Sequence, residues 1–249
     1  MTARRLLVAT GLRDEIPGVP GLAELWGTGV LHCPYGHGWE VRDKRIGILA
    51  ASPAAVHQAL LLRQLSPQVT VLDQTAAGLT GEQREQLGAL GVAVIDGPVA
   101  WVESDGGRLT GVRLTGGTLV ALDAQVVAPR LTANAGLLEP LGLKPAEVRM
   151  GSHVLGTQVE ADRAGATGVP GVWAAGNVAD IQAQVITAAA AGLAAGAAIN
   201  ADLAAEDARR AASARQPGSK ARREGTEVAA DPGGRPRAVA YNPIVSRQA

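Results

Sequence analysis

The sequence predicts an α/β fold built on a parallel, Rossmann-like sheet, and three observations indicate it. Between residues 46 and 95, short apolar runs alternate with segments of helical spacing. This βαβαβ order implies parallel strands joined by crossover helices. Between residues 98 and 122, strand-like runs are separated by Gly-rich turn signals, which predict an antiparallel meander. A strand and a long Ala- and Gly-rich helix after residue 170 add a second α/β segment.

The elements follow from these patterns in chain order. A short strand over 4–9 precedes a link that is rich in Pro and Gly. The next segments predict strand 46–49, helix 54–65, strand 69–72, helix 81–90, strand 92–95, meander strands 99–103, 109–115 and 118–122, and a last strand 125–128. After residue 129 we expect a short helix 135–141, a strand that runs into a Gly turn over 171–177, and a long helix from 182 to about 206.

Composition bounds the function. The chain has 249 residues and no formal net charge, and its single cysteine excludes an internal disulfide and a Cys-based metal cluster, which fits the cytoplasm. We expect no metal site. The basic residues of 207–249 lack interleaved aromatics, so a disordered, solvated tail is favoured over nucleic-acid binding. The uncharged stretch 181–201 consists mainly of Ala and Gly, which predicts a buried helix of a soluble protein and no membrane span.

One segment, His32 to Glu40, concentrates reactive side chains. It contains Cys33, and it resembles a redox Cys-x-x-Cys loop in which Gly36 replaces the second cysteine. His32 and His37 flank the thiol, and either would favour the thiolate if protonated. Without a second cysteine, a thiol/sulfenate or mixed-disulfide cycle is the redox chemistry that remains. The alternative is that Cys33 is a small buried apolar residue.

A second candidate site follows the strand over 46–49. Ala50, Ser52 and Ala55 occupy the spacing of a G-x-G-x-x-G/A dinucleotide turn, and they open a helix. Ala50 and Ser52 replace the first two glycines, and each of these two adds a Cβ where a pyrophosphate would have to approach the backbone. Asp73 ends the next strand, where an acid would bind a ribose hydroxyl and repel a 2′-phosphate, with no arginine close in sequence. The residues leave open whether this turn binds NAD(P) or is a scaffold that no longer does.

Several motifs together resemble the low-molecular-weight thioredoxin reductases, flavoproteins of the pyridine nucleotide-disulfide oxidoreductase family. The resemblance is closest to an actinobacterial branch that is also similar to gliotoxin- and holomycin-type dithiol oxidases. It rests on the strand end Leu7–Gly11, the link Pro17–Trp26, the loop Cys33–Glu40, the flavin motif Gly168–Val178 and the helix Gln182–Ala198. These motifs cover residues 4 to 205 and are specific in combination.

The resemblance implies an FAD lobe that is split in sequence by an inserted NAD(P)-type lobe carrying the meander. Residues 1–27 and 129–206 would be pieces of an incomplete FAD lobe, 28–128 the inserted lobe, and 207–249 the tail. Cys33 would be the substrate-facing nucleophile and His37 the general acid/base. FAD would lie against residues of the two flavin motifs and the following helix, namely Thr10, Gly11, Gly176, Asn177, Val178, Gln184 and Val185.

The implied function is an FAD-dependent oxidoreductase that acts on small-molecule or protein dithiols and disulfides, as a homodimer. Three departures bear on this activity: the family's N-terminal G-x-G-x-x-G unit is absent, Gly36 replaces the flavin-proximal cysteine, and the turn at Ala50 is altered. We therefore expect sequence to be missing upstream. Two alternatives stay open, a non-catalytic module that dimerises or binds a partner, and one half of a split flavoenzyme.

Overall fold

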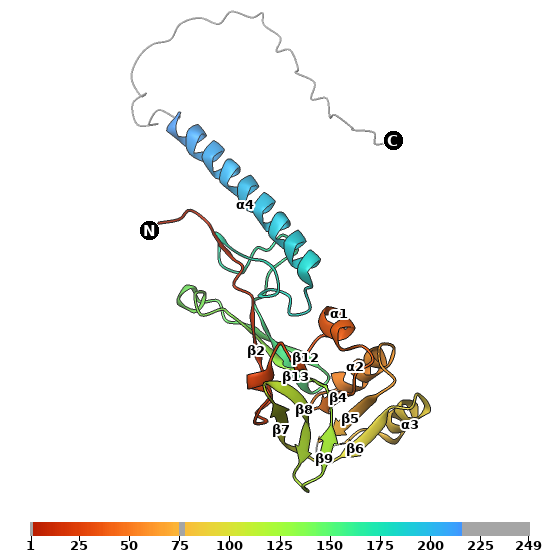
Figure 1. Cartoon of the computed structure of the whole chain (residues 1–249). Helices are drawn as coiled ribbons and strands as arrows, with labels where there is room; N and C mark the ends of the chain where they lie inside the picture. The colour runs from red at the N-terminus through yellow and green to blue at the C-terminus, as the bar shows by residue number, and fades with distance from the viewer. Residues whose placement is uncertain (1, 75–77, 216–249) are drawn as a thin grey trace, which may run out of the picture. The chain divides into compact units, whose positions relative to one another are not determined.

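The computed structural model describes residues 2–74 and 78–215. Contacts divide the chain into two units, residues 1–203 and 204–249. The first unit contains the β-strands (Figure 1). Its mixture of parallel and antiparallel sheets with helices confirms the predicted α/β class.

A five-stranded parallel sheet forms the centre of the inserted segment. Its order is β3-β10-β4-β5-β6, and its strands and connecting helices are β3 Val30–Leu31, β10 Ala124–Val126, β4 Ile46–Ala50, β5 Val69–Asp73, β6 Ala93–Asp96, α2 Ala54–Arg63 and α3 Gly81–Ala89. The strand over 46–49 is buried along its whole length, as expected for a central parallel strand. The predicted βαβαβ order is confirmed, whereas β3 was not predicted because only two residues form it.

The meander covers the face of this sheet that α2 and α3 leave open. β7 Val99–Asp105, β8 Arg108–Leu114 and β9 Leu119–Ala121 pair antiparallel, as predicted. Leu49 and Leu72 of the sheet pack with Val112 of the meander, while Ile48 and Val71 pack with Leu62 of α2. Figure 1 shows the helices and the meander on opposite sides of β4, β5 and β6. Alternate residues of each strand therefore enter two different cores.

The ends of the first unit pair with each other around the inserted segment. β1 Leu6–Val8 runs parallel to β14 Val172–Ala174. A four-stranded sheet of order β12-β13-β11-β2 consists of β12 Ala146–Met150, β13 His153–Gln158, β11 Arg130–Ala133 and β2 Leu12–Glu15. Thus β1 and β2 both pair with strands that follow residue 129. The boundaries at residues 27, 128 and 206 stay a prediction.

Two predictions after residue 129 are wrong. The expected helix 135–141 is only a 3-10 turn over Glu139–Leu141, since Pro140 and Gly142 interrupt a longer helix. The stretch from residue 130 to residue 158, for which we expected no strand, contains β11, β12 and β13, whose short strands carry polar residues and lack clean alternation. The link before residue 26 likewise contains β2 and a 3-10 turn, Ala23–Leu25.

The last helix differs most from expectation. α4 spans Val185–Ala214, so it starts later than predicted and continues through residues expected to be disordered. The expectation of a buried helix is wrong, because Ala195 is the one residue of α4 that is fully buried. By length and composition α4 alone among the described helices could cross a membrane, which is weak evidence because helices of soluble proteins also meet that criterion. Of the predicted tail, residues 216–249 lie outside the described residues.

Candidate active site

Cys33 lies in the turn between β3 and a one-turn helix, α1 Pro34–His37. Its backbone is extended, and its carbonyl oxygen accepts a hydrogen bond from the His37 N–H at 3.0 Å. Pro34 starts the helix, where its missing N–H costs nothing. A 3-10 turn over Gly38–Val41 follows directly. The thiol is a free, half-buried group, so the reading of Cys33 as a fully buried apolar residue is not supported.

The two histidines beside Cys33 lie in different environments. His32 stacks on Trp26 with ring centroids 5.6 Å apart, and its carbonyl accepts a hydrogen bond from buried Gln58. Burial lowers the pKa of His32, and the charge of His37 lowers it further against the opposing effect of Asp14. The lowered pKa disfavours the protonated form of His32, which makes His32 a weaker source of positive charge for Cys33 than the sequence suggested.

His37 is placed for proton transfer. Its Nδ1 lies 3.4 Å from a carboxylate oxygen of Glu40, and its side chain is 40% exposed. It is four residues from Cys33, across the single turn of α1. Glu40 can orient the ring, as a carboxylate does for many catalytic histidines. His37 is thus the better acid/base candidate of the two.

Gly36 leaves space beside the thiol. A Cβ built at Gly36 would lie 3.6 Å from the Cys33 Cβ and 3.8 Å from its Sγ, and apart from the flanking residues and the backbone of α1 itself no other described atom would come within 4 Å. Disulfides have Cβ–Cβ distances of about 3.5–4.5 Å. The loop therefore has the geometry of a Cys-x-x-Cys pair although one sulfur is missing. A sulfur from another molecule could occupy the same position.

The dinucleotide-like turn lies at the carboxyl end of β4. Ala50 and Ala55 are both 1% exposed, so their methyl groups fill the core beneath the turn. The Ser52 hydroxyl accepts a hydrogen bond from the Ala54 N–H at 3.3 Å, and Pro53 has no N–H to offer. A cleft of about 400 Å³ lies next to this turn. The turn differs from the usual glycine-rich one, because Ala50 and Ser52 carry Cβ atoms, Pro53 has no N–H and the Ala54 N–H already donates to Ser52.

The Asp73 carboxylate is already bonded within the protein and is not free to bind a ribose hydroxyl as the sequence suggested. Its carboxylate is buried, accepts a hydrogen bond from the Leu79 N–H at 2.8 Å, and forms an ion pair with Arg84 at 2.6 Å. Arg84 also binds Asp96 at 2.6 Å. Although no arginine lies close to Asp73 in sequence, α3 brings Arg84 back to the end of β5. The signal was present in the sequence as an arginine one turn into a helix with a strong N-cap at Thr80.

The two predicted flavin motifs meet at the carboxyl ends of β1 and β14. Gly11 and Gly176 both adopt positive φ, and a Cβ on Gly11 would lie 3.4 Å from the Asn177 side-chain oxygen. Asn134, which the sequence reasoning missed, donates from its side chain to the Thr10 carbonyl and accepts the Thr10 hydroxyl at its own carbonyl. Val178, the residue after Asn177, is buried. Two glycine turns at the carboxyl ends of parallel strands form the kind of cradle that binds cofactors in α/β folds.

Gln184 and Val185 lie at the start of α4 and are exposed. Val185 is 89% exposed. Among the described residues, no hydrogen bond, ion pair or ring contact joins these two, or the Gly11–Asn177 cradle, to Cys33 or His37. The structure thus brings together Thr10, Gly11, Gly176, Asn177 and Val178 as one group and Cys33 with His37 as another.

A comparison with known families decides the assignment. The family described as pyridine nucleotide-disulphide oxidoreductase matches residues 1–192. The chain belongs to this family. Thioredoxin reductase tcpT of Claviceps purpurea is 32% identical over 148 residues, which are 57% of this chain and 46% of tcpT. The chain thus spans about half the length of that relative.

Solved structures agree with the family and extend the likeness to the fold. The crystal structure of HlmI is 44% identical, with a TM-score of 0.75 over 85% of this chain and 64% of HlmI. An oxidoreductase from Agrobacterium tumefaciens is 33% identical, with a TM-score of 0.72 over 81% of this chain and 65% of that protein. Together with tcpT, these relatives place the chain among the thioredoxin reductase-like members, as the motifs predicted.

Proposed function

We propose that this family member catalyses thiol–disulfide chemistry on dithiol or disulfide substrates, with Cys33 as nucleophile, His37 as acid/base and FAD as electron carrier. The observation that carries the proposal is the space at Gly36. A substrate sulfur in that space would be in van der Waals contact with the Cys33 Sγ, where the loop geometry suits a disulfide. His37 lies on the same helical turn and is exposed to solvent.

The step performed by this chain's own residues is an exchange. The Cys33 thiolate attacks one sulfur of a substrate disulfide, forms a mixed disulfide and releases the second substrate sulfur as a thiolate. His37 donates a proton to that leaving thiolate. A second thiol then attacks the mixed disulfide, restores Cys33 and leaves with the bound substrate sulfur as a new disulfide. Electrons and atoms balance without a further oxidant, since one disulfide is consumed and one is formed.

The Gly11–Asn177 cradle supports FAD as the cofactor of the family. Thr10, Gly11, Gly176 and Asn177 would hold part of it, because both glycines lack a Cβ where the chain turns and Asn177 offers a donor and an acceptor. When bound, a flavin supplies a two-electron reservoir for net oxidation or reduction of the substrate. We propose that no nicotinamide step passes through the inserted lobe, because the turn at Ala50 lacks the first two glycines of a dinucleotide turn and Pro53 offers no N–H.

The experiment is a purification of the full chain followed by two measurements. Visible absorption reports bound flavin. Exchange between a small disulfide and dithiothreitol is then measured above the uncatalysed rate for the wild type, Cys33→Ser and His37→Gln, with exposed His57→Gln as the matched control. We expect Cys33→Ser to abolish the catalysed rate, His37→Gln to lower it and His57→Gln to leave it unchanged. A catalysed rate that survives Cys33→Ser removes Cys33 from the mechanism, and a colourless protein removes FAD.

A second candidate function, association with another polypeptide, has its own observation. Val185, Ile186 and Leu193 of α4 are 77–89% exposed, and Leu6 and Leu7 of β1 are 38–39% exposed. Apolar surface of this extent favours an interface. We propose a homodimer, which sedimentation of the wild type against Leu193→Asp would test. A wild type that sediments as a monomer at micromolar concentration would rule out the homodimer.

The single cysteine supports the cytoplasm as the proposed location.

A further inference from the structure

A polar cleft lies at the end of the five-stranded sheet where β4 and β10 begin, the end opposite the Ala50–Ala55 turn. Its volume is about 750 Å³, within the range of about 300–1,000 Å³ typical of small-molecule sites. None of the activities considered above uses it. The side chains that matter for recognition are Thr28, Lys44, Asp105, Arg108, Thr110 and Asp123.

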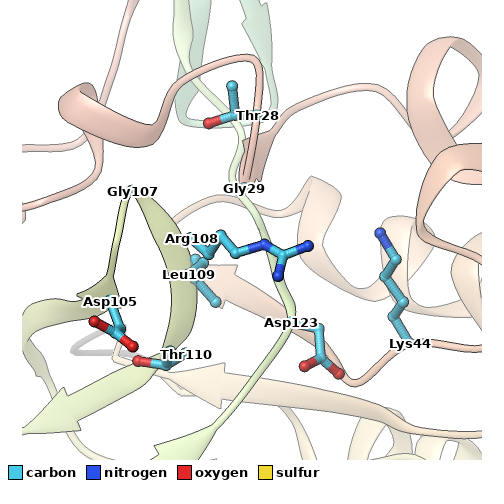
Figure 2. Close-up of a pocket in the computed structure, with 9 residues that line it drawn as sticks. All are labelled: Thr28, Gly29, Lys44, Asp105, Gly107, Arg108, Leu109, Thr110 and Asp123. Atoms are coloured by element: carbon cyan, nitrogen blue, oxygen red, sulfur yellow. The ribbon is translucent and has the colours of Figure 1, made fainter.

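Two cations in the cleft, Lys44 and Arg108, form no side-chain hydrogen bond or ion pair among the described residues. Arg108 faces Asp105 across the β7–β8 hairpin, a place where opposite charges usually pair. Figure 2 shows its guanidinium directed instead into the space between Gly29 and Asp123. Lys44 lies across the same space on the loop before β4. Neither side chain donates a hydrogen bond or forms an ion pair in the part of the chain that the structure describes.

The carboxylates of the cleft do not neutralise these cations. Asp123 is already occupied, because Arg45 donates to it from Nε at 2.9 Å, from Nη2 at 2.6 Å and from its backbone N–H at 3.0 Å. These hydrogen bonds, with a smaller contribution from the charge of Lys44, lower the pKa of Asp123 to about 2. When Arg45 is counted with the lining, three cations (Lys44, Arg45 and Arg108) face two carboxylates (Asp105 and Asp123), so the charged groups at the cleft sum to +1.

We propose that this cleft binds a small phosphorylated polyol, of the sugar phosphate class. The Arg108 guanidinium and the Lys44 ammonium would hold the phosphate, since a planar fork and a point charge are the two common ways in which proteins bind it. Asp105 and the hydroxyls of Thr28 and Thr110 would bind the hydroxyl groups. The described lining holds no aromatic side chain on which a base could stack, which favours a sugar phosphate over a nucleotide.

The test uses the full chain and calorimetric titration with ribose 5-phosphate, ribose and inorganic phosphate at fixed ionic strength. We expect saturable binding of ribose 5-phosphate that is tighter than that of inorganic phosphate, and none of ribose at the same concentration. Arg108→Gln and Lys44→Gln should each weaken binding by about tenfold or more, the loss expected for one hydrogen bond to a charged group. Thermal unfolding of each variant checks that it is folded.

Matched controls separate a specific site from general attraction. Arg163→Gln removes the same charge from an exposed position outside the cleft and should leave binding unchanged. Asp105→Asn should weaken ribose 5-phosphate but not inorganic phosphate, because it replaces a carboxylate acceptor of hydroxyl groups by a weaker neutral one, whereas the loss of a negative charge does not oppose phosphate. The proposal is overturned if no ligand saturates, if Arg108→Gln binds like the wild type, if Arg163→Gln weakens binding equally, or if inorganic phosphate binds as tightly as ribose 5-phosphate.

Discussion

Substituting Gly36 by cysteine should restore an internal disulfide to the active-site loop. The Cβ positions of residues 33 and 36 would be 3.6 Å apart, within the disulfide range of about 3.5–4.5 Å. Gly36 does not have positive φ, so a cysteine is compatible with its backbone. The chain-entropy model for a loop that spans residues 33–36 gives roughly 2 kcal/mol of stabilisation for the oxidised form.

The assay compares free thiols and stability in the oxidised and reduced states. After mild oxidation, Gly36→Cys should have no titratable thiol and a monomer mass lower by two hydrogen atoms, while the wild type keeps its one thiol. Urea unfolding should give the oxidised variant a free energy of unfolding about 2 kcal/mol above that of its reduced form. Gly36→Ser controls for the added side chain. Two thiols that persist in the monomer after oxidation would falsify the proposed loop geometry.

Three further predictions follow from buried or paired charges. Asp73→Ala should lower the free energy of unfolding by about 3 kcal/mol, because it removes a buried acceptor of Leu79 and Arg84. The control, exposed Asp96→Ala, should lower it by less than about 1 kcal/mol. Equal losses in urea unfolding would contradict the burial argument. The lowered pKa of His32 means that this residue takes up a proton in the unfolded chain before it does so in the folded one, so the free energy of unfolding should fall as pH drops below 6.5. His32→Phe keeps an aromatic ring against Trp26 and should flatten the dependence of stability on pH. An unchanged dependence would refute this assignment. The pKa of Asp123 is lowered to about 2 from 3.8, so the stabilising contribution of its carboxylate should be complete above pH 4 and disappear as pH falls through 2. Nuclear magnetic resonance titration of Asp123 should show the lowered pKa in the wild type and a return toward the usual value in Arg45→Gln.

Local patterns predicted the inserted lobe well, because its strands are apolar runs bounded by turn residues and its helices have clear apolar spacing. β4, β5, β6, α2, α3 and the meander all appear close to the predicted residues. The strands that were missed, such as β2 and β11, owe their structure to pairing with each other across more than a hundred residues. No window of the sequence contains such a partner, so local reasoning assigned them to links.

The candidate site likewise has features that the sequence predicts and features that depend on the fold. Cys33, His37, the Gly36 replacement and the two glycine turns are visible as residue types at fixed spacings, so the sequence alone determined the family and its candidate groups. Which groups can act depends on burial and on partners distant in the chain. Desolvation lowers the pKa of His32, the return of α3 brings Arg84 onto Asp73, and Asn134 joins the Gly11–Asn177 cradle. Only the tertiary structure decided these points, because desolvation and long-range hydrogen bonds arise from packing and not from local sequence.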